Sequence, residues 1–123
     1  MPSLRLSFAL AVLMAVTAVA PPSSYHARLR KSSPAANDTV AAPAQLQLWF
    51  SEKPVLAFTK VTLKNPAGVA QPLGASSFSD ASDSAAVVYP VAAPLAPGRY
   101  TVNWSAAGDD GHPMKGKFEF SVR

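Results

Sequence analysis

The sequence predicts an all-β domain, built as an antiparallel sandwich or a small barrel. Five short runs alternate apolar and polar residues with a period of two, the pattern of strands that bury one face. Turns rich in proline and glycine separate these runs, and the 12 prolines argue against long helices. Beyond the N-terminal apolar stretch no segment has a convincing 3.6-residue period, and 123 residues indicate a single domain.

The expected strands follow from this alternation. They span residues 45–52, 58–64, 85–89, 99–105 and 115–123. In the second of them the phase slips between Phe58 and Val61, which indicates a bulge or a late start. The last two strands each present an apolar face that we assign to the core, formed by Tyr100, Val102, Trp104, Phe118, Phe120 and Val122.

Two segments lack such a pattern. Residues 26–44 are interpreted as irregular, because Ser33-Pro34 and Asn37-Asp38 are turn-forming pairs. Residues 69–84 are small and polar, and are interpreted as a loop or as one weak strand near Phe78.

Composition excludes several classes of function. The chain has no cysteine, so it has no disulfide, no thiolate metal site and no cysteine nucleophile. The formal net charge of +4 is spread along the sequence, with no basic run interleaved with aromatic residues. We therefore expect no nucleic-acid partner and interpret the charge as a mildly basic surface.

The N-terminus resembles a secretory signal peptide. Arg5 supplies the positive charge, and residues 6–20 form an apolar run that is short for a transmembrane span. An uncleaved anchor is the alternative. We expect residues 1–25 to be the signal peptide and residues 26–123 to be the mature domain, which should be a monomer and not embedded in a membrane.

The cleavage point stays open. Ala18-Val19-Ala20 fits the rule of small residues before the cut, but Pro21 follows directly and should hinder cleavage there. Cleavage before His26 would place Tyr25 next to the cut, which fits that rule poorly.

The segment with the clearest chemistry is Asp109-Asp110-Gly111-His112-Pro113. In extended backbone the side chains of Asp110 and His112 would share a face, and Pro113 biases the residue before it toward that conformation. A carboxylate and an imidazole could then hold a borderline divalent metal such as copper or zinc. Asp109 is the alternative carboxylate. A D-x-H spacing alone is weak, and a histidine near a turn is usually an ordinary surface residue.

His26 is the other histidine of the chain and could complete such a site. As the first mature residue it would offer both an imidazole nitrogen and the α-amine. Three nitrogens and one carboxylate oxygen form a tetragonal set, which Cu(II) prefers. A terminus at Ser24 would instead place His26 third, where an amine, backbone amides and the imidazole can form a different chelate.

Many short elements in order resemble the CopC-type periplasmic copper-binding, or copper-resistance, proteins, over nearly all of residues 26–123. They are His26, Leu29, Ser33-Pro34, Leu48, Phe50-Ser51-Glu52, Pro97-Gly98, Tyr100-x-Val102-x-Trp104, Asp110-Gly111-His112-Pro113, Gly116 and Phe120-x-Val122. The resemblance implies a cupredoxin-like Greek-key β-barrel. It also implies a Cu(II) site made by His26, Asp110 and His112. Glu52 is a further ligand or a neighbour of the ligands, or else an ordinary exposed carboxylate.

The function that the resemblance implies is periplasmic Cu(II) binding in copper sequestration, trafficking or resistance, with transfer to an inner-membrane copper importer as a further step. On this interpretation the protein is not an enzyme. The alternatives are a small copper monooxygenase with a histidine brace and a metal-free structural β-sandwich. Some family members carry a methionine-rich loop for Cu(I), whereas Met114 is the one methionine after the signal region, so a Cu(I) site is not expected.

Overall fold

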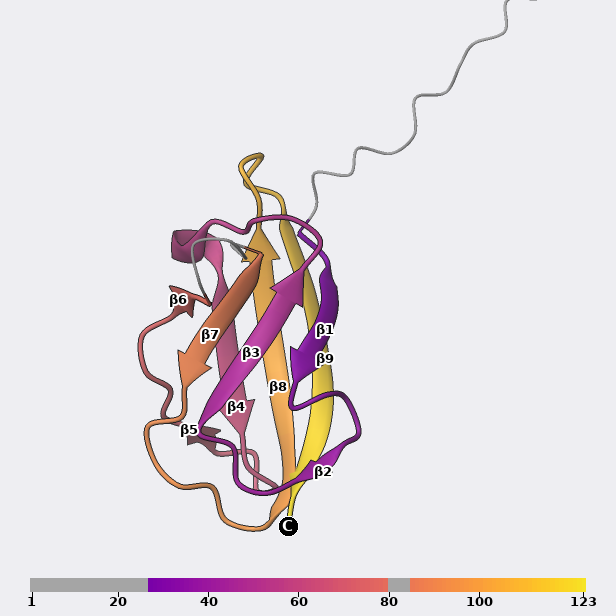
Figure 1. Ribbon diagram of the computed structural model, residues 1–123, viewed down its shortest axis with the longest axis vertical. Helices are drawn as coiled ribbons and strands as arrows, with labels where there is room; N and C mark the ends of the chain where they lie inside the picture. The colour runs from indigo at the N-terminus through magenta and orange to yellow at the C-terminus, as the bar shows by residue number, and fades with distance from the viewer. Residues whose placement is uncertain (1–26, 80–84) are drawn as a thin grey trace, which may run out of the picture.

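The computed structural model describes residues 27–79 and 85–123, which form two β-sheets packed face to face (Figure 1). The four-stranded sheet has the order β1-β3-β7-β6, and its neighbours are antiparallel. Its strands are β1 (Leu29–Ser33), β3 (Gln45–Phe50), β7 (Ala86–Pro90) and β6 (Ser77–Phe78). The predicted all-β sandwich is therefore confirmed.

The five-stranded sheet has the order β2-β9-β8-β4-β5. Its strands are β2 (Thr39–Val40), β9 (Pro113–Val122), β8 (Gly98–Ala107), β4 (Lys60–Lys64) and β5 (Ala70–Gln71). The long β8–β9 hairpin pairs ten residues of each strand, and β2 joins β9 in parallel. No helix in the described part of the chain is long and apolar enough to cross a membrane.

All five expected strands are present, with ends that shift by a few residues. The slip at Phe58 is a late start, because a 3-10 turn, η1 (Leu56–Phe58), precedes β4. The weak strand expected near Phe78 is β6. β5, in contrast, lies in a segment that was otherwise interpreted as a loop.

The interpretation of residues 26–44 as irregular is wrong for the part that forms β1 and β2. β1 lies at the edge of its sheet and pairs with β3, with a register shift between Leu29 and Lys31. Its sequence has no apolar alternation because most of its side chains are exposed or only half-buried. Backbone pairing, rather than a buried face, defines this strand, and backbone pairing leaves no periodic signal in a sequence.

The core lies between the two sheets and contains four of the six side chains that the alternation assigned to it, whereas Trp104 and Phe118 are only partly buried and pack against it. Its largest fully buried members include Phe120, Leu46, Leu48, Leu63, Val87 and Val102. The rings of Tyr100 and Phe120 stack with centroids 5.7 Å apart. Tyr89 of β7 donates a 3.3 Å hydrogen bond to the carbonyl of Thr59, which ties β7 to the residue that leads into β4 of the other sheet. Burial raises the pKa of the Tyr89 hydroxyl, so this donor keeps its proton at neutral pH.

Trp104 and Gly116 face each other across the β8–β9 hairpin, and this pair predicts a stability effect. A Cβ atom at position 116 would lie 2.7 Å from Cζ2 of Trp104. The indole packs edge-on against the ring of Phe50, with ring centroids 5.7 Å apart. Because the ring has little room to retreat, Gly116→Ala should lower the free energy of unfolding by about 1–3 kcal/mol. Urea denaturation followed by circular dichroism measures this change.

A double-mutant cycle tests the cause of this loss. The three atoms nearest to the added methyl group, Cζ2, Cε2 and Nε1, all belong to the indole, and the smaller phenylalanine ring has no atom in place of Cζ2, the nearest of them. The cost of Gly116→Ala should therefore shrink in a Trp104→Phe background. An equal cost in both backgrounds would show that the methyl group does not act through the indole.

Candidate metal centre

The Asp-Asp-Gly-His segment is the tip of the β8–β9 hairpin. The last paired residues are Ala107 and Pro113, and the N–H of Gly111 donates a 3.0 Å hydrogen bond to the carbonyl of Gly108. Gly111 has φ of +73°, a left-handed conformation that glycine adopts without steric cost. The loop is therefore a tight turn set by its sequence.

Asp110 and His112 are brought together by this turn. The backbone N–H of His112 donates a 3.1 Å hydrogen bond to Oδ1 of Asp110, and both residues are exposed at the loop tip. The expectation of extended backbone at this point is wrong, because Asp110 lies in a turn and Gly111 is left-handed. The two residues are neighbours for a different reason: the aspartate side chain folds back on the backbone of the loop.

Glu52 enters the same end of the sandwich from the loop after β3. The N–H of Val55 donates a 2.9 Å hydrogen bond to the carbonyl of Ala107, which anchors this loop to the end of β8. Figure 1 shows the end of β3, the β8–β9 loop and the start of the described chain at this one end. We call this end the loop pole.

A pocket of about 580 Å³ opens at the loop pole and is lined by Glu52, Lys53, Asp109 and Asp110. It combines three carboxylates with one ammonium group. Both aspartates line it, so the geometry does not select Asp110 over Asp109 as the carboxylate ligand. His112 is not among the residues that line this pocket, although its loop forms one wall.

The residues that the structure describes do not by themselves complete a metal site. Within ranges 27–79 and 85–123, no three histidine, cysteine, aspartate or glutamate side chains come close enough to hold an ion. Asp110 and His112 share a loop, and Glu52 lines the pocket beside Asp110. His26, the fourth expected ligand, lies outside the described residues, as does the whole segment 1–25 that was interpreted as a signal peptide.

The first described residues are held firmly at the loop pole. Ala27, which follows His26 in the chain, is fully buried. The N–H of Arg28 donates a 3.0 Å hydrogen bond to Oγ of Ser51, and the N–H of Ser51 donates a 2.7 Å bond to the carbonyl of Arg28. These reciprocal bonds fix the start of the domain beside the residue that precedes Glu52.

Sequence reasoning missed two contributors to this site. Ser51 acts as the anchor of the chain start, and its place between Phe50 and Glu52 gave no sign of that role. Lys53 brings a positive charge to the pocket wall, and its ammonium group lies 5.0 Å from the ring centroid of Phe78. Its position next to Glu52 in the sequence was the one feature that could have indicated this place in the pocket.

Comparison with known proteins gives consistent matches. The sequence model of the CopC domain matches residues 29–123. Copper resistance protein C of Xanthomonas campestris pv. juglandis is 34% identical over 122 residues, which cover 95% of this chain and 96% of the relative. Protein YobA of Escherichia coli strain K12 is 37% identical over 121 residues, covering 96% and 94% of the two chains.

Solved structures agree with the sequence matches. The crystal structure of PcoC, a methionine-rich copper resistance protein from Escherichia coli, superposes with a TM-score of 0.67 at 33% identity. It covers 80% of this chain and 99% of that chain. CopC from Methylosinus trichosporium OB3b gives a TM-score of 0.69 at 28% identity, with coverage of 79% and 93%.

Proposed function

Since the chain belongs to the CopC family, in which several relatives are copper resistance proteins, we propose that it binds copper in the periplasm as Cu(II). The observation that carries this proposal is the loop pole. There, a loop with a histidine and two aspartates, a glutamate and the anchored start of the domain lie at one end of the sandwich.

His26, Asp110 and His112 are the ligands in this proposal. His26 is joined to Ala27 by one peptide unit, and adjacent Cα atoms are about 3.8 Å apart. Ala27 is buried and Arg28 is bonded to Ser51 at the loop pole, and this anchored chain start supports the choice of His26 as a ligand. Cleavage before His26 would add the α-amine as a further nitrogen ligand.

Glu52 and Asp109 complete the electrostatic setting of the proposed site. Both carboxylates line the pocket with Asp110, so they favour a bound cation even where they do not ligate it. Lys53 on the same wall offsets part of this charge. A site with few carboxylates in contact and several nitrogens suits copper better than a hard cation such as Ca²⁺.

The donor set favours Cu(II) over Cu(I). Cu(I) prefers soft thioether ligands, and the residues that the structure describes include one methionine, Met114. It is half-buried on β9, paired with Ala106. PcoC, by contrast, is described as methionine-rich. The nitrogen and carboxylate donors available here match the tetragonal preference of Cu(II).

The proposed role is that of a periplasmic copper carrier or buffer, which could pass the ion to an inner-membrane copper importer. A pocket at one exposed pole suits transfer, because an acceptor can approach the ion without unfolding the sandwich. The loop tip that carries Asp110 and His112 is exposed to solvent.

Native mass spectrometry of the exported protein with one equivalent of Cu(II) tests this function. We expect a mass that begins at His26 and one retained copper ion, because that terminus would add the α-amine to the proposed ligands. A mature form that retains no copper would contradict the proposal. A longer N-terminus with bound copper would instead indicate a chelate formed by the terminal residues.

A further inference from the structure

The outward face of the five-stranded sheet gathers basic side chains that are scattered along the sequence. Lys60 and Lys64 lie on β4, Arg99 on β8, and Lys115 and Lys117 on β9. All five are exposed. We call this surface the basic face; it lies along the side of the sandwich and is separate from the acidic pocket of the loop pole.

Strand register produces this face. Ser105 of β8 pairs with Lys60 on one side and Lys115 on the other, so these three residues form one row across the sheet. The next row joins Thr62, Asn103 and Lys117 in the same way. Neighbouring strands lie about 4.8 Å apart, so the backbones at Lys60 and Lys115 lie about 10 Å apart, on either side of Ser105.

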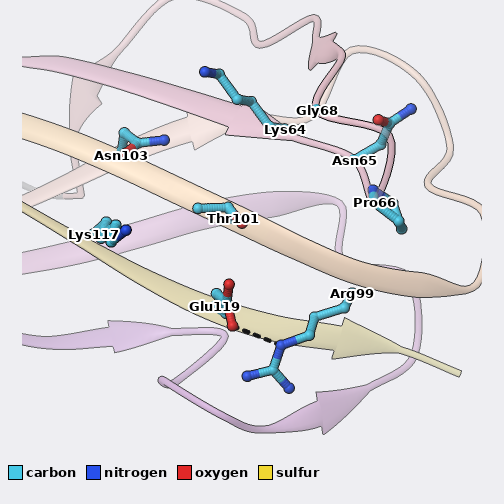
Figure 2. A pocket seen from close by; sticks show the side chains of 9 residues that line it. All are labelled: Lys64, Asn65, Pro66, Gly68, Arg99, Thr101, Asn103, Lys117 and Glu119. Atoms are coloured by element: carbon cyan, nitrogen blue, oxygen red, sulfur yellow. Dashed lines mark hydrogen bonds and ion pairs between the residues drawn. The ribbon is translucent and has the colours of Figure 1, made fainter.

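A third row consists of Lys64, Thr101 and Glu119. Figure 2 shows this part of the face, with the side chains of Thr101 and Asn103 on β8 between Lys64 and Lys117. It forms a shallow hollow of about 430 Å³. A second hollow of about 460 Å³ continues toward Lys60 and Lys115, so the face is one extended surface.

The charges on this face are largely unneutralised. Arg99 forms a 2.6 Å ion pair with Glu119, and both side chains are about half exposed. Among the residues described, none of the four lysines has an ion-pair partner. Like charges within one or two strand spacings repel one another, so a surface of this kind is favourable where an anionic partner relieves the repulsion.

The chemistry of the face favours a lipid surface over a specific protein partner. Protein interfaces depend on a buried apolar or aromatic centre with the charges at the rim. The centre here is the row of Thr101, Asn103 and Ser105 on β8, which offer hydroxyl and amide groups. Attachment to anionic headgroups needs only a group of cations at a broad surface, and several lysines together are enough.

We propose that the basic face attaches the protein to a bilayer surface containing anionic phospholipids. The ammonium groups of the four lysines would approach the phosphate groups, while Thr101, Asn103 and Ser105 donate hydrogen bonds to them. Lys60 and Lys115 lie toward the end of β8 that leads into the loop with Asp110 and His112. If the proposed function holds, attachment along this side leaves the loop pole open beside the membrane, within reach of a copper acceptor.

Vesicle sedimentation tests this attachment with the exported protein and no copper. The probes are phosphatidylcholine vesicles with and without phosphatidylglycerol, at low and at high salt. We expect binding only to the anionic vesicles, weakened by salt. Each lysine removed should weaken binding about fivefold, so Lys64→Gln/Lys117→Gln should lose about 25-fold.

The matched control is Arg30→Gln/Lys31→Gln, which removes the same charge from β1 of the other sheet. It should bind as the wild type does, and circular dichroism verifies that both variants fold. Equal loss in both variants would show that net charge, not this face, attracts the vesicles, and would overturn the proposal. So would an absence of wild-type binding, including the case in which the face binds an acidic protein instead. None of these results depends on copper, so the copper site is tested separately.

Discussion

His112→Ala should lower the affinity for Cu(II) by more than about 100-fold, equivalent to about 2.7 kcal/mol of binding free energy. The substitution removes an imidazole ligand from the proposed set. It should leave the loop intact, because the bond to Oδ1 of Asp110 comes from the backbone N–H of residue 112, which alanine retains. Competition against a chelator of known affinity measures the loss.

The exposure of His112 and a control variant on the same hairpin make this test specific for the ligand role. His112 is exposed, so its loss creates no cavity in the core. Lys115→Ala, on the same hairpin and also exposed, serves as the control and should keep its copper affinity. An unchanged affinity in His112→Ala would remove His112 from the site and leave the carboxylates and the chain start as its donors.

Which parts of the molecule could be predicted depends on whether side chains or backbone carry the information. The core strands were readable because Leu46, Leu48 and Phe50 must alternate with polar residues to bury one face. β1 was not readable, since it is held by backbone pairing at the sheet edge. The late start of β4 was visible because the slip at Phe58 breaks the alternation.

The candidate metal site, too, could be predicted from the sequence only in part. The residue types of the Asp-Asp-Gly-His loop indicated metal chemistry, but the assumed extended geometry was wrong, because the left-handed Gly111 makes a turn there. Glu52 was connected to this loop only by resemblance, and the structure gives the physical link through the bond between Val55 and Ala107. The basic face could not be seen in the sequence at all, since only strand register aligns Lys60 with Lys115.

The position of the mature N-terminus should matter as much as His112. Adding one glycine before His26 in the mature protein should lower the Cu(II) affinity by about 100-fold or more, because the α-amine would move one residue away from the imidazole. The rest of the site would keep its residues. Chelator competition measures the affinity, and electron paramagnetic resonance of the copper-loaded protein should show that one nitrogen ligand has been replaced.

The control for this extension is one glycine added after Arg123, which lies at the end of the sandwich opposite the loop pole (Figure 1). That variant should bind copper as the wild type does. If the N-terminal extension had no more effect than the C-terminal one, the α-amine would not be a ligand. Copper would then be bound by side chains alone, including those of the β8–β9 loop. The hydrogen bonds between Arg28 and Ser51 would stabilise the fold rather than position a metal ligand.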